Sequence, residues 1–232
     1  MVVAKSTMKQ ERELPNTCFI TKDNGKLVGI IMSGHGGRRG FIQHTTIKKE
    51  GRGKDIKMQE RTIMIFPQFT DQEIINEIRQ KYDPLYKLVR PHITLVFPFK
   101  SQMSDMILKQ KLEECLKETA SFPLILQGIS KHKDTYGNYI FLNITKGSQE
   151  IIEIHNSLYL HIFGEQYCQP YIPHMTIGNL DSTDKMEQAY NSLKNRDLCF
   201  TTVIEKISVE VIGNNGESNI IIEKPLHPHY NT

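Results

Sequence analysis

A short string of residues occurs twice in this chain, and it constrains the fold more than any other feature. The two copies are Pro91-His92-Ile93-Thr94-Leu95 and Pro173-His174-Met175-Thr176-Ile177, about 80 residues apart. Each copy opens the first strand in the same predicted order of helix, strand, helix, strand, strand. A repeat of this length is too long for a solenoid and is typical of two lobes within one domain.

A change in amino-acid composition predicts a domain boundary near Glu60. Residues 1–60 are rich in glycine and basic side chains and form a β-rich N-terminal segment, in which Cys18–Thr21 and Leu27–Met32 flank a Lys22-Asp23-Asn24-Gly25 turn. Residues 61–232 form the main domain, with halves at about 61–145 and 146–232. We expect residues 1–60 to be a structural appendage, and the formation of an oligomer through this segment stays open.

The main domain shows regular apolar periodicity, which predicts alternating helices and strands. The first expected helix begins at Thr70 or Asp71 and carries Ile74, Ile75, Ile78 and Tyr82 on one face. The other expected helices span 104–119, 148–163 and 182–194. The expected strands cover 62–66, 92–97, 123–130, 139–144, 174–178, 200–212 and 219–223.

Each repeated string has two chemically different faces. In a strand, residues two apart point to the same side, so His92 and Thr94 project together while Pro91, Ile93 and Leu95 point to the other side. The second string repeats this division. Such a strand packs its apolar face into the core and shows an imidazole and a hydroxyl to a polar cleft.

Two facing imidazoles suit phosphodiester chemistry. An ordinary histidine pKa of about 6.5 allows one ring to be neutral and the other protonated near pH 7. The neutral ring would take a proton from attacking water, the charged ring would give one to the leaving ribose oxygen, and the hydroxyls of Thr94 and Thr176 would hold the phosphate oxygens. A single such motif is more simply a histidine bonded within its own sheet; two matched copies favour catalysis.

These two motifs closely resemble those of the two-histidine phosphoesterases, the superfamily that includes 2′-5′ RNA ligases and cyclic phosphodiesterases. Its hallmark is a pair of H-φ-[ST]-φ motifs, matched by His92-Ile93-Thr94-Leu95 and His174-Met175-Thr176-Ile177. The resemblance covers residues 61–232. It implies an α+β, bilobal, pseudo-two-fold fold with antiparallel sheets lining a central cleft and helices outside. It also implies catalysis by His92 and His174 without metal or cofactor.

The expected activity is that of a phosphodiesterase acting on 2′,3′-cyclic phosphates or 2′,5′-linked RNA and nucleotides. The motifs also leave open the reverse reaction, in which RNA ends are joined. The alternative is a non-catalytic module that binds RNA or nucleotides in the same cleft. Arg90 shares the strand parity of His92 and is a candidate phosphate contact, although a solvated surface arginine is the simpler interpretation. Tyr139 and Tyr171 are candidate base-stacking residues, against the alternative that they are core aromatics.

The first 60 residues resemble a fragment of a GNAT acetyltransferase. Strands at 27–31 and 41–47 lead to Glu50-Gly51-Arg52-Gly53-Lys54, but Asp55 and Lys57 stand where that family needs small residues beside the coenzyme A pyrophosphate. The helix that should follow is also missing. The fragment is therefore not expected to be a working acetyltransferase, and coenzyme A is not expected as a cofactor.

Composition limits the partners and the compartment. A net charge of +3 suits a small anionic substrate, such as an RNA end or a nucleotide, better than a wrapped duplex. The four cysteines contain no CxxC pair, which predicts neither disulfides nor a thiolate zinc site. No apolar run approaches the length of a membrane span and no signal peptide is evident, so we expect a cytoplasmic protein. The histidines outside the motifs are interpreted as bystanders.

Overall fold

The structure is a computed structural model, and it describes residues 17–23, 26–34, 41–47, 58–164, 167 and 169–228. The chain separates into two compact units, Met1–Met58 and Gln59–Thr232. In the first unit β1 (Thr17–Asp23), β2 (Lys26–Gly34) and β3 (Phe41–Ile47) form an antiparallel sheet in that order. The predicted hairpin is confirmed by the β1–β2 pairing. Positions 48–57 lie outside the described residues, so the acetyltransferase resemblance stays a prediction.

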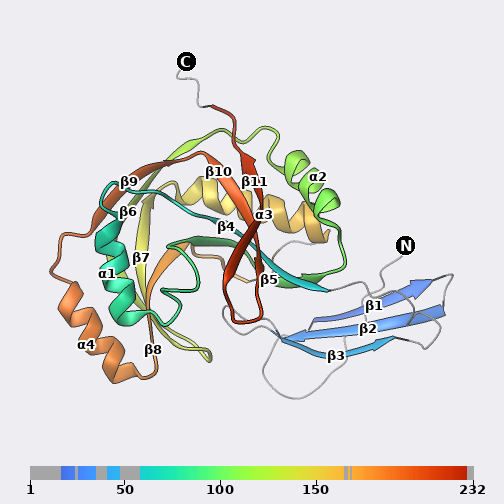
Figure 1. Ribbon diagram of the computed structural model, residues 1–232, viewed down its shortest axis with the longest axis horizontal. Helices are drawn as coiled ribbons and strands as arrows, with labels where there is room; N and C mark the ends of the chain where they lie inside the picture. The colour runs from blue at the N-terminus through green and yellow to red at the C-terminus, as the bar shows by residue number, and fades with distance from the viewer. Residues whose placement is uncertain are drawn as a thin grey trace. The chain divides into compact units, whose positions relative to one another are not determined.

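The described residues of the second unit form two four-stranded antiparallel sheets and four helices, which confirms the predicted α+β class (Figure 1). One sheet has the order β11-β10-β4-β5 and the other β8-β7-β6-β9. The strands are β4 (Gln59–Ile65), β5 (Ile93–Ser101), β6 (Phe122–Lys133), β7 (Asn138–Lys146), β8 (His174–Leu180), β9 (Cys199–Ile204), β10 (Lys206–Ile212) and β11 (Ser218–Pro225). The helices are α1 (Gln72–Tyr82), α2 (Asp105–Cys115), α3 (Ser148–Phe163) and α4 (Thr183–Leu193).

Each sheet takes strands from both halves of the chain. The first sheet joins β4 and β5 to β10 and β11, and the second joins β6 and β7 to β8 and β9. The halves are interleaved because the β6–β7 hairpin pairs with strands that follow α3 rather than with β5. In both sheets the strand that carries the repeated string is an edge strand, β5 in one and β8 in the other.

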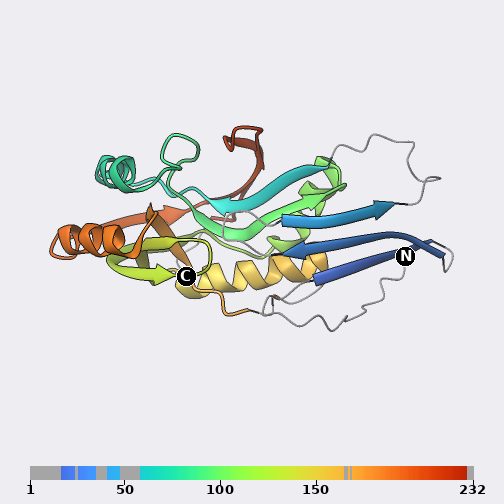
Figure 2. The ribbon, with the colours of Figure 1, turned by 90° about the horizontal axis from the view of Figure 1, so that it is seen from below.

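The helices bury one apolar face each. Ile75 and Ile78 of α1 are at most 3% exposed, and Leu108 and Leu112 of α2 are fully buried. Complete burial of one such side chain contributes about 1.5–3 kcal/mol to folding. Helices α1 and α4 lie together at one end of this unit, where Tyr82 and Ser192 share a hydrogen bond of 3.0 Å (Figure 1). Helix α3 runs along one side of the strands (Figure 2).

Helix boundaries follow local signals. The α3 bounds are those predicted, and Gly164 ends the helix in the left-handed region at φ 73°, which glycine adopts without strain. The Ser104 hydroxyl accepts the Ile107 N–H at the start of α2.

One predicted strand is wrong as a single element. The run 200–212 divides at Glu205 into β9 and β10, which belong to different sheets. Both segments have strand-type composition, so only the partners decide the break. β9 pairs with β6, while β10 pairs with β4 and β11.

Candidate active site

The repeated strings lie at the starts of the edge strands β5 and β8, which contact each other; His92 immediately precedes β5 and His174 is the first residue of β8. Exposure alternates along both strings as predicted. Ile93, Leu95, Met175 and Ile177 are fully buried, whereas the motif histidines and threonines are half-buried. The apolar face of each strand therefore enters the core, and His92, Thr94, His174 and Thr176 lie on the opposite faces.

Both histidines are held in the same way. Nδ1 of His92 lies 2.8 Å from the carbonyl oxygen of Arg90, and Nδ1 of His174 lies 2.7 Å from that of Ile172. A carbonyl oxygen can only accept, so each Nδ1 must carry a hydrogen and donate it. This contact fixes the ring orientation and makes Nε2 the nitrogen that can act as an acid or a base.

The two imidazoles differ in their ring neighbours. The Phe141 ring stacks on His174 with centroids 3.7 Å apart and planes at 24°. Desolvation by burial lowers the pKa of His174 to about 4, and the nearby His132 acts in the same direction, while the hydrogen bond to Ile172 opposes them. His174 is therefore neutral at pH 7, with its lone pair on Nε2.

The ring neighbour of His92 is placed differently. The Phe66 ring lies 6.2 Å from the His92 ring at an angle of 55°, so it does not cover a ring face. Phe66 also lies under the guanidinium of Arg90, at 4.6 Å. Arg90 is exposed, and it lies before β5, where its carbonyl orients His92 and its side chain borders a surface pocket.

A hydrogen bond ties the two motif regions together. The Tyr171 hydroxyl, three residues before His174, donates to the carbonyl oxygen of Thr94 at 2.8 Å. The Tyr171 ring stacks on His155 at 3.7 Å, and Nδ1 of His155 in turn donates to the Leu95 carbonyl at 2.6 Å. These contacts indicate that Tyr171 positions the motif strands, and they favour its packing interpretation over base stacking.

Tyr139 lies in a row of aromatic rings that leads to His174. The Tyr139 and Phe141 rings stack at 5.8 Å, and the His132 and Phe141 rings at 5.4 Å. Burial raises the pKa of Tyr139 to about 12, so its hydroxyl stays protonated. His132 belongs to strand β6, where it pairs with Tyr139.

Sequence reasoning missed the importance of Phe141 and His132. The available signal was the parity of β7, in which Tyr139 and Phe141 alternate with the buried Ile140 and Leu142. That alternation puts both rings on one face. Placing this face beside His174 requires the β7–β8 register, in which Phe141 pairs with Thr176.

Within the described residues, no cluster of three or more histidine, cysteine, aspartate or glutamate side chains is arranged to hold a metal ion. Cys115 and Cys199 are free thiols. No helix in this part of the chain is long and apolar enough to cross a membrane.

Comparisons with known proteins support a phosphoesterase. The sequence model of the 2′-5′ RNA ligase superfamily matches residues 66–215, and the chain belongs to this superfamily. Curated relatives include a "Putative phosphoesterase" of Bacillus licheniformis, 27% identical over 66% of this chain and 90% of the relative. Another of that name, from Oceanobacillus iheyensis, is 30% identical over 50% of this chain and 67% of its own length.

Solved structures show the same fold. The Escherichia coli protein LigT complexed with 3′-AMP aligns with a TM-score of 0.54 and 14% identity, over 73% of this chain and 99% of LigT. LigT complexed with ATP aligns with a TM-score of 0.51 and 15% identity, over 74% of this chain and 99% of LigT. At this identity the likeness establishes the architecture, and the bound nucleotides are properties of LigT.

Proposed function

We propose that this protein is a phosphodiesterase that opens 2′,3′-cyclic phosphates or cleaves 2′,5′-linked RNA and nucleotides by paired-histidine acid–base catalysis. The observation that supports this proposal is the matched anchoring of the two imidazoles. Each Nδ1 donates to the carbonyl two residues before it, at 2.8 Å for His92 and 2.7 Å for His174. Anchored rings with a defined reactive nitrogen are what general acid–base catalysis requires.

We infer the roles of the two rings from the burial of His174. His174, neutral at pH 7 because its pKa is lowered to about 4, is the base. For a 2′,3′-cyclic phosphate, Nε2 of His174 takes a proton from water as the water oxygen bonds to phosphorus. His92 then gives the proton on its Nε2 to the ribose oxygen as the phosphorus–oxygen bond breaks. The product is a ribose phosphomonoester, and the two proton transfers balance.

Thr94 and Thr176 are the proposed phosphate ligands. Each lies two residues after its histidine on the same strand face, and each is half-buried. A hydroxyl at this position can donate to a non-bridging oxygen as negative charge accumulates on it. One hydroxyl from each edge strand gives the phosphate two donors.

The row formed by His132, Tyr139 and Phe141 is the proposed nucleobase platform. It begins at His174, through the 3.7 Å contact of Phe141, and continues to Tyr139. Base stacking on an aromatic side chain contributes about 1–3 kcal/mol and tolerates any base. A nucleotide or an RNA end fits this surface better than a phosphodiester without a base. The complexes of LigT with 3′-AMP and ATP support a nucleotide ligand for this fold.

The test is an assay of the full chain, with chelator present, on a nucleoside 2′,3′-cyclic phosphate, a 2′,5′-linked dinucleotide and a 3′,5′-linked control. We expect turnover of at least one of the first two. His92→Ala and His174→Ala should each reduce kcat by about 10²–10⁴.

His161→Ala is the matched control, because His161 is an exposed histidine whose Nδ1 also bonds a backbone carbonyl, that of Ser157, at 2.8 Å. It should leave turnover unchanged. Binding of these nucleotides without any turnover would favour the alternative of a non-catalytic binding module. Equal turnover in the wild type and both motif variants would contradict the mechanism.

A further inference from the structure

A basic pocket lies next to the first motif but has no part in the proposed reaction. It has a volume of about 480 Å³ and is lined by Gln72, Asn76, Arg79, Tyr86, Lys87, Arg90 and Pro91. Three of these seven residues are cationic and none is acidic. Pro91 connects the pocket directly to His92 in the chain.

Arg79 is the buried member of this set. Its side chain is 1% exposed, its Nε donates to Asp83 Oδ2 at 2.9 Å, and its Nη1 donates to the Val89 carbonyl at 2.9 Å. Nη2 is also buried, and it has no hydrogen-bond partner among the described residues. A buried charged donor without an acceptor is unfavourable, so this nitrogen has unused capacity for an anion.

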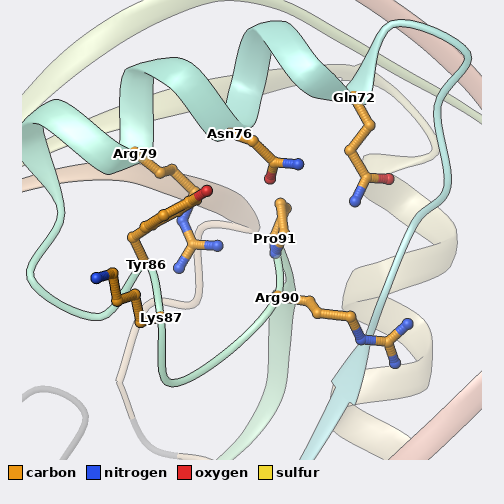
Figure 3. A pocket seen from close by; sticks show the side chains of 7 residues that line it. All are labelled: Gln72, Asn76, Arg79, Tyr86, Lys87, Arg90 and Pro91. Atoms are coloured by element: carbon orange, nitrogen blue, oxygen red, sulfur yellow. The ribbon is translucent and has the colours of Figure 1, made fainter.

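The guanidinium is held in place before any ligand arrives. Two of its nitrogens are fixed by Asp83 and Val89, and the α1 side chains of Gln72, Asn76 and Arg79 extend toward Pro91 (Figure 3). Lys87 and Arg90 lie on opposite sides of the pocket, and their charged groups point away from Arg79 (Figure 3). Fixed donors reduce the ordering cost of binding.

The lining residues together carry a positive charge, which favours an anion. Asp83 offsets the charge of Arg79, while Lys87 and Arg90 take no part in that pair and add two positive charges on opposite sides of the pocket. Amide groups from Gln72 and Asn76 add uncharged donors between them. Arginine, lysine and amide donors around one cavity match a phosphoryl group.

We propose that this pocket is a second phosphoryl-binding site, separate from the paired histidines, which takes inorganic phosphate or the terminal phosphate of a nucleotide. It differs from the proposed catalytic site in its residues, since none of His92, Thr94, His174 or Thr176 lines it. Because Nη2 is buried, an anion reaches it when the lining side chains shift, and the anion then supplies the acceptor that Nη2 lacks. If the nucleotide is the source of the phosphoryl group, a nucleotide that carries an additional phosphate gains affinity over one without it.

The first measurement is calorimetric titration of the full chain with inorganic phosphate at constant ionic strength. We expect saturable binding that persists in a His92→Ala/His174→Ala double variant. Asn76→Asp places a carboxylate in the pocket without removing Arg79, and it should weaken binding by about tenfold or more, as should Arg90→Gln. Lys81→Gln, an exposed cation of the same helix outside the pocket, should have no effect.

The second measurement identifies the source of the phosphoryl group. A nucleoside 2′,3′-cyclic phosphate is titrated with and without a 5′-phosphate, into the wild type and Asn76→Asp. Tighter binding of the 5′-phosphorylated form that is lost in Asn76→Asp identifies the nucleotide as the source. Equal affinities for both forms, together with inorganic phosphate binding that depends on Asn76, identify free phosphate.

The results separate this site from the proposed catalysis. Phosphate binding that disappears in the histidine double variant, or that is equal in the wild type, Asn76→Asp and Arg90→Gln, would overturn the second site, whatever the turnover. If the protein shows no turnover but binds phosphate, and Asn76→Asp weakens that binding, the result would support the site and contradict only the catalytic proposal. Because Arg79→Ala can unfold α1 by leaving Asp83 unpaired, the conclusion does not depend on that variant.

Discussion

Replacing Phe141 with alanine should raise the pKa of His174. The difference between the ordinary value of 6.5 and about 4 corresponds to roughly 3 kcal/mol of preference for the neutral ring. Its largest cause is desolvation, and the Phe141 ring covers one face of the imidazole at 3.7 Å. Exposing that face should restore about one pKa unit, or about 1.4 kcal/mol, and bring the variant to roughly pH 5.

The assay is an NMR titration of the histidine ring signals in the free enzyme, assigned with His174→Gln. A second readout is the acid limb of kcat/KM, which falls when the free base becomes protonated. A raised pKa should move that limb upward, so Phe141→Ala should lose more of its activity at pH 5 than the wild type does. Phe141 is half-buried, so the variant is expected to fold.

Tyr139→Ala is the matched control for this titration. The Tyr139 ring stacks on Phe141 at 5.8 Å and is one ring further from His174 than Phe141 is. It should move the His174 pKa by much less than Phe141→Ala. A wild-type His174 that titrates near 6.5, or equal shifts in the two variants, would refute the assignment of His174 as the desolvated base.

Two further predictions concern stability. Because the folded-state pKa of His174 is lowered, the unfolded chain binds more protons than the folded chain between about pH 4 and 6.5. The free energy of unfolding should therefore fall as the pH drops through this window. Urea titrations should show a shallower fall in His174→Gln. Tyr171→Phe removes the donor to the Thr94 carbonyl and should lower the free energy of unfolding by about 1–2 kcal/mol. Tyr136→Phe, at an exposed tyrosine, should lower it by less than about 0.5 kcal/mol. Equal losses would show that the Tyr171 hydrogen bond does not stabilise the fold.

The parts of the structure that depend on local pattern were predictable. The α3 helix has the expected bounds, and the alternating burial around His92 and His174 follows from strand parity alone. Apolar periodicity over these segments agrees with the fold, so local and global preferences coincide.

The parts that depend on distant pairing were not predictable. Division of the 200–212 run at Glu205 reflects the partners of β9 and β10, and no turn residue marks it. The stacking of Phe141 on His174 needs the β7–β8 register, which one sequence does not contain. Asp83 lies four residues after Arg79, a spacing that allows an ion pair within one helix, whereas the Val89 carbonyl reaches the guanidinium only through the fold.

The matched anchoring of two imidazoles with unmatched neighbours bears on how such a site can arise. Two identical halves joined as a symmetric pair would offer twin rings of equal proton affinity, and neither would be preferred as donor or acceptor. Joining the copies in one polypeptide lets each diverge: the position opposite Thr176 holds Phe141, while the position opposite Thr94 holds Met64. Two copies of one motif within a single chain can therefore have different ring neighbours.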